Sequence, residues 1–587
     1  MKLGGLSVSL MVALLAGCTG VIDGSSQEAD IDSSLPATNA GNTGQGPAGI
    51  AGTNGGPADE GSGQAVGNGG SGAGPDGGGG VASAGGAVDG PIASEPLPPL
   101  PPGAPCRVAA PMRRLTVAQY KNALRDIFAG AATLPADFAL ATVGLPESGF
   151  STDPNFNAVD LAVTRDLHGA SESVALSILE KLPTIVACAA TPSAACAETF
   201  IDQVGRRAFR RPLLAAERTR LLNAFKLGTG ADAFKDGIAA AVTTLLQSPQ
   251  FLYQAEVGEA VAGETGVLRL SPYEVASRLS FSLWDSVPDA ALLDAAAKGS
   301  LATSEGVRAQ AERLLNDEKA RATIVRFARE WIHLEVPKPG VDRLDSAYTP
   351  ALSAAMQSEL DSFVTGSFLG AGTSIGAFFT SAAPFGNATL RTFYEQSGGM
   401  GPRAGLLTQP ALLTGIANPQ DTSPIRRSVF VRRQLTCEDF PHPPDDALAV
   451  EGSLPSPANA TARERSAVRM QNTRCVGCHT LIDPLGFGFE AFDELGRYRT
   501  QTASGVAIDA RGDFVAPASG DLGGKFDTLA ELGQRLGASP TVHQCVVKQL
   551  FRFNYGRLEG SADSCAIEGA VERWGNELNL RELLLTL

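Results

Sequence analysis

The chain contains few of the residues and motifs from which common active sites are built. Its 587 residues include only 5 histidines, 6 methionines and 9 cysteines. No G-x-S-x-G, Walker or G-x-G-x-x-G pattern occurs between a predicted strand and helix, which argues against serine-hydrolase, P-loop and dinucleotide sites. The chain has one C-x-x-C and no H-x₃₋₅-H pair. A four-ligand zinc site would need a second pair of soft ligands at such a spacing, so the sequence disfavours zinc.

Other absences bound the architecture and the partners. No period of 20–50 residues repeats, which excludes a solenoid. Beyond the N-terminus, no stretch reaches the ~18 uninterrupted apolar residues that a transmembrane helix needs. The formal net charge of −15 argues against nucleic acid as a partner.

The N-terminus, MKLGGLSVSLMVALLAGCTG, has the pattern of an export signal. Lys2 precedes a short apolar run, and the run ends in small residues before Cys18. This ending resembles a bacterial lipoprotein lipobox, and Thr19 by the same resemblance favours the outer membrane. We therefore expect residues 1–17 to be a lipoprotein signal peptide and Cys18 to be lipidated, the alternative being an ordinary cleaved signal with an incidental cysteine.

Composition divides the rest of the chain. Residues 18–105 are dominated by Gly, Ser, Ala, Asn and Pro and cannot bury enough apolar surface to fold, so we expect a disordered tether. The remainder predicts a multi-domain helical body with five parts, at 106–185, 195–260, 265–398, 400–502 and 503–587.

The fold class predicted for this body is mainly α. Thr116 followed by Gln119 is a capping box, and Ser271 with Glu274 is another. Ser423 before Pro424 marks a third helix start. Strand signals are few, and residues 505–517, GVAIDARGDFVAP, predict one short β-hairpin.

Six cysteines outside the lipobox and the C-x-x-C motif suggest three disulfides in an exported chain. Proximity in the sequence suggests Cys188 with Cys196 and Cys545 with Cys565. Cys106 with Cys437 follows by elimination.

Cys475-Val476-Gly477-Cys478-His479 is the attachment pattern for a c-type haem. Two thiols one helical turn apart can add to the two vinyl groups of the porphyrin, and the adjacent histidine can ligate the iron. A dithiol-exchange site usually lies between a strand and a helix of a βαβ unit, which this region lacks. The predicted cofactor is thus one covalent haem c, with His479 as the proximal iron ligand.

The sequence downstream of the motif is apolar enough to exclude water from a buried ring, or to form ordinary core under a helix; its apolar residues are Leu481, Ile482, Leu485, Phe487, Phe489 and Phe492. Asp483 is a candidate for hydrogen bonding near the site, although an aspartate before a proline is more often a turn residue. Arg497 and Arg499 are candidates for pairing with haem propionates, or else solvated surface arginines.

No methionine follows His479, so the sixth iron ligand is open. The candidates are His543, Met470, Met400 and His442, with Met356 as a more distant one. His543 lies in a predicted helix beside Cys545, where a structural role is an equal alternative. A vacant sixth position would make the iron reactive as well as a relay.

Several segments together resemble one family. They include RRLTVAQYKNALRDIFAG, GRRAFRRPL, SPYEVASRLSFSLWDSVPDAALLDAA, TSPIRRSVFVRRQL, CVGCHTLIDPLGFGFEAFDELGRYR and VVKQLFRFNYGR. This arrangement is similar to the planctomycete-type cytochrome c family, also found in myxobacteria, whose members join five domains of unknown function, one with the haem motif. The resemblance implies export and a c-type haem on Cys475, Cys478 and His479. It implies no particular reaction.

The function expected is that of an exported, membrane-anchored monohaem c-type cytochrome-like protein in electron transfer. Its expected location is the outer membrane, facing the periplasm or the cell surface, with membrane contact through the lipid anchor only. The redox partner protein is not identified by the sequence. The alternatives are a haem-dependent oxidoreductase, because the body is far larger than one haem needs, and a non-redox binding or scaffold lipoprotein.

Overall fold

The computed structural model describes residues 106–586, apart from positions 143–145, 230–231, 265–266, 442, 445, 448, 451–453 and 456–459. The expected signal peptide, Cys18, the tether and His442 lie outside the described residues. The residues that are described belong to one compact unit, Ala93–Leu587.

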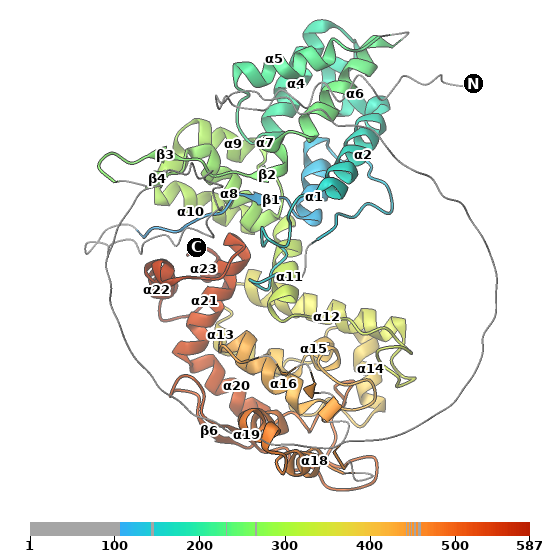
Figure 1. The fold of residues 1–587 in the computed structure, drawn as a ribbon, viewed down its shortest axis with the longest axis vertical. Helices are drawn as coiled ribbons and strands as arrows, with labels where there is room; N and C mark the ends of the chain where they lie inside the picture. The colour runs from blue at the N-terminus through green and yellow to red at the C-terminus, as the bar shows by residue number, and fades with distance from the viewer. Residues whose placement is uncertain are drawn as a thin grey trace, which may run out of the picture. The chain divides into compact units, whose positions relative to one another are not determined.

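The helices of the N-terminal part surround the smaller of two apolar clusters in the described chain (Figure 1). They are α1 (Val117–Ile127), α2 (Leu161–Ser177), α3 (Leu182–Ile185), α4 (Ala194–Ala208), α5 (Ala215–Phe225), α6 (Ala233–Leu246) and α7 (Pro249–Leu252), with 3₁₀ turns η3 (Leu179–Lys181) and η4 (Ala187–Ala190).

The remaining helices, all of which except α18 contribute residues to the larger cluster, follow in the chain. They are α8 (Pro272–Trp284), α9 (Ala290–Ala297), α10 (Ser304–Leu315), α11 (Lys319–Trp331), α12 (Pro350–Leu369), α13 (Ile375–Thr380), α14 (Ala388–Gln396), α15 (Pro410–Gly415), α16 (Pro424–Phe430), α18 (Ala462–Arg469), α19 (Thr473–Phe487), α20 (Leu529–Ala538), α21 (Pro540–Tyr555), α22 (Ser564–Trp574) and α23 (Leu580–Leu584). Three 3₁₀ turns, η5 (Ser300–Ala302), η6 (Gly405–Thr408) and η8 (Ser561–Asp563), and the π-helical turn η7 (Val431–Leu435) complete the set.

Helix α8 joins the two clusters. Its Phe281 belongs to the smaller cluster, whereas Leu283 and Trp284 belong to the larger one. Phe281 and Leu283 lie two positions apart, and side chains at that spacing point to different faces of a helix, so one helix can seal two cores. The larger cluster also runs continuously from α8 to α23, so the expected C-terminal domains share one apolar core.

The predicted helix starts are confirmed, and with them the mainly α fold class. Thr116 Oγ1 accepts a hydrogen bond from the Gln119 N–H at 3.1 Å, which completes the capping box of α1. Ser271 and Glu274 form the box of α8, and Ser423 caps α16. These starts were predictable because a cap is made by residues three positions apart.

The strands are short and antiparallel. They pair as β1 (Arg113–Arg114) with β2 (Tyr253–Gln254), β3 (Glu259–Ala260) with β4 (Leu268–Arg269), and β5 (Gly512–Phe514) with β6 (Gly524–Phe526). The predicted hairpin within 505–517 is wrong, because β5 pairs with a strand outside that range. The pairing lets both Phe514 and Phe526 bury their rings, at 1% and 2% exposed, in the larger cluster.

The disulfides confirm one predicted pair and correct two. Cys188 bonds to Cys196 as expected. Cys106 bonds to Cys565 and Cys437 bonds to Cys545, so the pairs Cys545–Cys565 and Cys106–Cys437 are wrong. Cys545 lies within α21, which packs against η7 and so brings it to Cys437 at the end of that turn.

Cys565 lies in the first turn of α22. It bonds instead to Cys106, at the start of the described chain. Arg557 donates to the carbonyl of Ala109 at 2.9 Å, which also holds this start near α22. Among the described residues, no helix combines the length and apolar character needed to cross a membrane.

We predict that peptide mapping without reduction will recover Cys106 linked to Cys565 and Cys437 linked to Cys545. The double substitution Cys106→Ser with Cys565→Ser should lower the free energy of unfolding by about 2–4 kcal/mol in urea titrations, because it opens a long covalent loop. A recovered peptide joining Cys545 to Cys565 would contradict the fold at this point.

Candidate functional site

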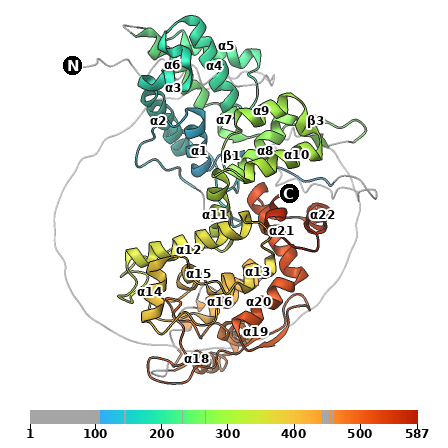
Figure 2. The same ribbon diagram turned by 180° about the vertical axis from the view of Figure 1, so that it is seen from behind.

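The C-x-x-C-H motif lies in the first two turns of α19. Asn472 caps this helix by accepting a hydrogen bond from the N–H of Arg474 at 3.0 Å. Three residues separate the end of α18 from the start of α19. The two helices pack against each other and lie side by side in Figures 1 and 2. Thr461 and Glu464 form a capping box that fixes the start of α18.

The two cysteines of the motif are free thiols, whereas all other described cysteines form disulfides. Cys475 is half-buried and Cys478 is exposed. A side chain at Gly477 between them would meet no other atom within 4 Å. Both thiols therefore lie on the open side of the helix, one turn apart, where a bulky group can reach them.

His479 is held from one side by a buried carboxylate. Its Nδ1 lies 2.9 Å from Oδ1 of Asp483, one helical turn further on. A carboxylate accepts at this position, so the contact favours the tautomer with the proton on Nδ1. The lone pair of Nε2 is then available to a metal, which is the usual arrangement of a ligand histidine with a carboxylate behind it.

Asp483 itself is the centre of a small polar network, and it is only 1% exposed. Its Oδ2 accepts from the Ser466 hydroxyl at 2.5 Å and from Nη2 of Arg469 at 3.0 Å, both on α18. Burial alone would raise the pKa of this carboxyl, but the hydrogen bond to His479 and the charge of Arg469 hold it below its ordinary value. The carboxylate therefore ties α18 to α19 and orients the histidine ring.

Of the two alternatives for Asp483, hydrogen bonding near the site is confirmed and the turn residue is wrong. The aspartate and Pro484 both lie inside α19. The residue before a proline is biased away from the α region, which made a turn the natural expectation. The spacing of four residues between His479 and Asp483 favours the hydrogen bond, because it places both side chains on one helix face.

The apolar residues downstream of the motif pack into the protein. Leu485, Phe489 and Phe492 belong to the larger cluster, Ile482 and Phe487 are buried, and Leu481 is half-buried. The ring of Phe487 also lies under the guanidinium group of Arg463, 4.4 Å from its centroid. The second half of α19 is thus anchored in the core, while the half that carries the thiols projects toward solvent.

Two buried arginines from the segment TSPIRRSVFVRRQL fix this anchored half. Arg427, on α16, donates to the carbonyls of Phe489, Phe492 and Asp493 at 2.7–2.9 Å. Arg432, in the π-helical turn η7, donates to the carbonyl of Leu481 at 3.0 Å.

Arg432 thereby holds a carbonyl inside α19, and Arg427 holds three carbonyls of the turn that follows the helix. Gly486 lets α16 approach closely, because a Cβ there would lie 2.1 Å from the carbonyl oxygen of Pro424. The sequence showed the arginines but not their role, since their acceptors are more than 45 positions away.

Arg497 and Arg499 are paired with carboxylates of the chain itself. Arg497 contacts Asp345 at 2.7 Å and Asp493 at 2.5 Å, and Arg499 contacts Glu490 at 3.2 Å. The interpretation as solvated surface arginines is wrong. Pairing with a haem propionate stays a prediction, and such a group would have to share these guanidinium groups with the carboxylates.

The candidates for the sixth ligand come from separate parts of the fold. His543, on α21, is buried with Nε2 2.9 Å from the carbonyl of Gly537, and its ring packs edge-on against Trp574. Met400 packs against the larger cluster, where Met356 is fully buried. Met470 is the C-cap of α18 and the nearest in sequence to the thiols. His442 lies outside the described residues, and the sixth ligand stays a prediction.

Within the described part of the chain, no group of three or more His, Cys, Asp and Glu side chains is arranged to hold a bare metal ion. The motif instead offers two accessible thiols and one oriented imidazole. This donor set suits a group that brings its own ring of nitrogen ligands and needs covalent attachment points from the protein, so a haem fits these residues.

Four family models match successive stretches of the chain, and each describes a protein of unknown function. They are DUF1595 at residues 196–256, DUF1592 at 270–395, DUF1588 at 403–502 and DUF1585 at 522–587. These are domains of the planctomycete cytochrome c-type family, and they occur here in succession. No curated protein and no solved structure matches the chain.

Each matched stretch lies inside one of the domain ranges expected from the sequence, whose limits stay predictions. The C-x-x-C-H motif falls within the DUF1588 stretch. A fifth domain at 106–185 stays a prediction as well.

We predict that Asp483→Ala will lower the free energy of unfolding by about 3 kcal/mol, because it removes the buried carboxylate that His479, Ser466 and Arg469 contact. Urea unfolding followed by circular dichroism measures this. The matched control is Asp446→Ala. Asp446 is exposed and pairs with Arg474, which lies on α19 as Asp483 does, so its removal should leave the unfolding midpoint unchanged. Equal midpoints for both variants would show that the polar network contributes nothing.

Proposed function

We propose that this chain is a monohaem c-type cytochrome-like protein that passes single electrons. Cys475 and Cys478 would hold one haem c through thioether bonds, and Nε2 of His479 would ligate its iron. The bound haem would supply a one-electron iron couple. The observation that supports this most is the pair of unpaired thiols, one turn apart, next to a histidine whose Nδ1 is held by Asp483.

The chain's own residues would set the properties of this site. Asp483 would orient the imidazole of His479 and increase its basicity through the hydrogen bond to Nδ1. Arg432 and Arg427 would keep the anchored half of α19 fixed in the core, so that the ligand does not shift when the iron changes charge. A rigid site favours fast electron transfer, because little has to rearrange.

We further propose that the protein is exported and anchored by lipid at Cys18 to the outer membrane, facing the periplasm or the cell surface. The lipobox-like ending of the N-terminal signal supports this. Three disulfides among the described cysteines also fit an oxidising compartment, because disulfides persist there and are rare in the cytosol.

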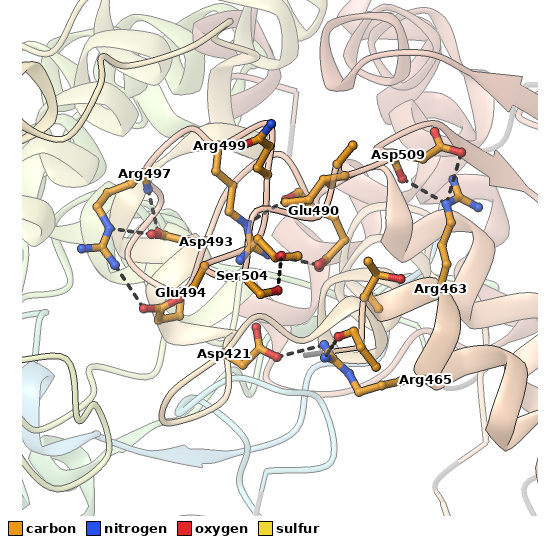
Figure 3. Close-up of a pocket in the computed structure, with 18 of the residues that line it drawn as sticks. Asp421, Arg463, Arg465, Glu490, Asp493, Glu494, Arg497, Arg499, Ser504 and Asp509 are labelled. Carbon is orange, nitrogen blue, oxygen red and sulfur yellow. Dashed lines mark hydrogen bonds and ion pairs between the residues drawn. The ribbon is translucent and has the colours of Figure 1, made fainter. Parts of the chain in front are cut away.

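A haem-dependent oxidoreductase is a second candidate, and one observation favours it. A pocket of about 540 Å³ (Figure 3) is lined mostly by residues of the matched stretch that holds the motif, and pockets of this size commonly take small molecules. Steady-state turnover of an added substrate would favour this candidate, whereas reversible one-electron titration without turnover would favour electron transfer alone.

The test is to express the chain with a cytochrome c maturation system and to measure covalent haem by a pyridine haemochrome spectrum after extraction with acidified acetone. We expect about one haem per wild-type chain and almost none in the double variant Cys475→Ala, Cys478→Ala, because no thioether can form. His168→Ala is the matched histidine control, since His168 lies on α2, outside the matched stretch that holds the motif, and pairs with Glu172, and its haem content should equal that of wild type.

A second prediction concerns the reduction potential. Asp483→Asn should raise it by on the order of 60 mV, because a weaker hydrogen bond at Nδ1 makes His479 a poorer donor to the oxidised iron, and a tenfold change in relative affinity for the two oxidation states equals about 59 mV. Spectroelectrochemical titration measures the shift. Asp446→Asn changes only the exposed pair with Arg474 and should leave the reduction potential unchanged. An equal shift of the potential in both variants would point to surface charge as its cause.

A further inference from the structure

The disulfide between Cys437 and Cys545 joins the end of the π-helical turn η7 to helix α21. Cys545 is 1% exposed, whereas Cys437 is half-buried, so Cys437 is the more accessible of the two residues. Helix α21 contributes several residues to the larger apolar cluster. The bond thus fixes the chain directly after η7 to a helix of the core.

The backbone around this bond is held in unfavourable conformations. Cys437 has a φ of +52°, and His333, whose ring nitrogens lie 3.3 and 3.5 Å from Nε2 of Gln434 in η7, has a φ of +47°. The residue after a helix C-cap often has a left-handed backbone, but it is then usually glycine, which has no Cβ. A π-helical turn is itself rare and occurs mostly at functional sites. Such conformations persist only where surrounding contacts hold them, and they gather in switch regions.

The residue after Cys437 connects the disulfide to the helix that carries the motif. Oε2 of Glu438 contacts Nη1 of Arg432 at 2.6 Å, and both side chains are buried. Nη2 of Arg432 donates to the carbonyl of Leu481 at 3.0 Å. Leu481 lies two residues after His479 on α19. A run of direct contacts therefore leads from the disulfide to the neighbourhood of the histidine.

Opening the disulfide would act on this run of contacts. Cys437 would be free to leave its left-handed conformation, and Glu438 would move with it because the two residues are adjacent. Arg432 would then lose the carboxylate that balances its buried charge. An unpaired buried charge is costly, so the guanidinium would turn toward solvent and release the carbonyl of Leu481. Arg427 would still hold the turn after α19, so the helix would loosen without detaching.

We infer that the Cys437–Cys545 disulfide is a redox-sensitive switch that sets how tightly η7 holds α19, and that its reagent is a dithiol. One thiolate of the dithiol attacks the sulfur of Cys437, and the bond to Cys545 breaks. The second thiol of the reagent then displaces Cys437. The chain thereby gains two electrons and two protons, and the reagent becomes a disulfide. The fold alone carries this coupling, and only its effect on an iron at His479 rests on the proposed function.

Hydrogen–deuterium exchange of the full-length variant Cys475→Ala, Cys478→Ala tests the coupling without haem and without the motif thiols. We expect the peptide covering residues 473–487 to exchange at least about tenfold faster after treatment with dithiothreitol, because its anchoring contact opens. Alkylation and peptide mapping show which disulfides have opened. Equal exchange of 473–487 in the oxidised and reduced chain, or a Cys437–Cys545 bond that stays closed until the chain unfolds, would refute the switch.

Two pairs of substitutions separate the switch from a general loss of stability. Cys437→Ser with Cys545→Ser opens the bond permanently, so 473–487 should exchange fast without any reductant. Cys188→Ser with Cys196→Ser is the matched control, because it opens a disulfide of the smaller apolar cluster and should leave 473–487 unchanged. Equal acceleration in both pairs would show a global effect and overturn the coupling.

Glu438→Gln tests the link between the disulfide and α19, and it serves if the cysteine variants fail to fold. The neutral amide balances the charge of Arg432 less well, so 473–487 should exchange faster although the disulfide is intact. Exchange as slow as in the parent chain would contradict the link. Because these measurements need no haem, a chain that fails to bind haem would refute the proposed function and leave this inference to be decided by exchange alone.

Discussion

The buried carboxylate of Asp483 is the contact on which the candidate site depends. It binds His479 on its own helix and Ser466 and Arg469 on the preceding one, so one side chain sets both the ring orientation and the packing of α18 against α19. A charge buried to this degree is tolerated only when its acceptor positions are filled. The same requirement makes the arrangement specific, because a shift of either helix would leave the carboxylate unsatisfied.

Helix α19 has to serve two opposed needs. Its first half must stay open for the thiols to be reached, and its second half must be immobile. The fold separates them along the helix axis: Cys478 is exposed, whereas Leu485 lies in the larger apolar cluster. The buried arginines Arg427 and Arg432 donate to the carbonyls of Phe489, in the turn after the helix, and of Leu481, inside it. This explains physically why an arginine-rich segment some 45 residues upstream accompanies the motif.

The features that could be predicted from the sequence are those that residues close together in the chain decide. The capping of α8 by Ser271 depends on residues three positions apart, and the haem motif is a run of five. The pairing of Cys106 with Cys565 spans 459 positions and follows only from how α22 meets the start of the described chain. For Asp483 the local rule for a residue before proline favoured a turn, and the tertiary contacts of its side chain outweighed that rule. The pocket of about 540 Å³ carried no sequence signal, since its lining residues come from separate stretches.

The measurement that tests the central proposal most directly is mass spectrometry of the chain produced with a cytochrome c maturation system, first intact and then after tryptic digestion. If Cys475 and Cys478 hold a haem, the intact mass will exceed that of the polypeptide by one haem, and the extra mass will stay on the peptide that contains both cysteines. A chain with unmodified thiols at both positions, produced beside a control cytochrome that matures normally, would contradict the assignment and leave the motif without its proposed cofactor.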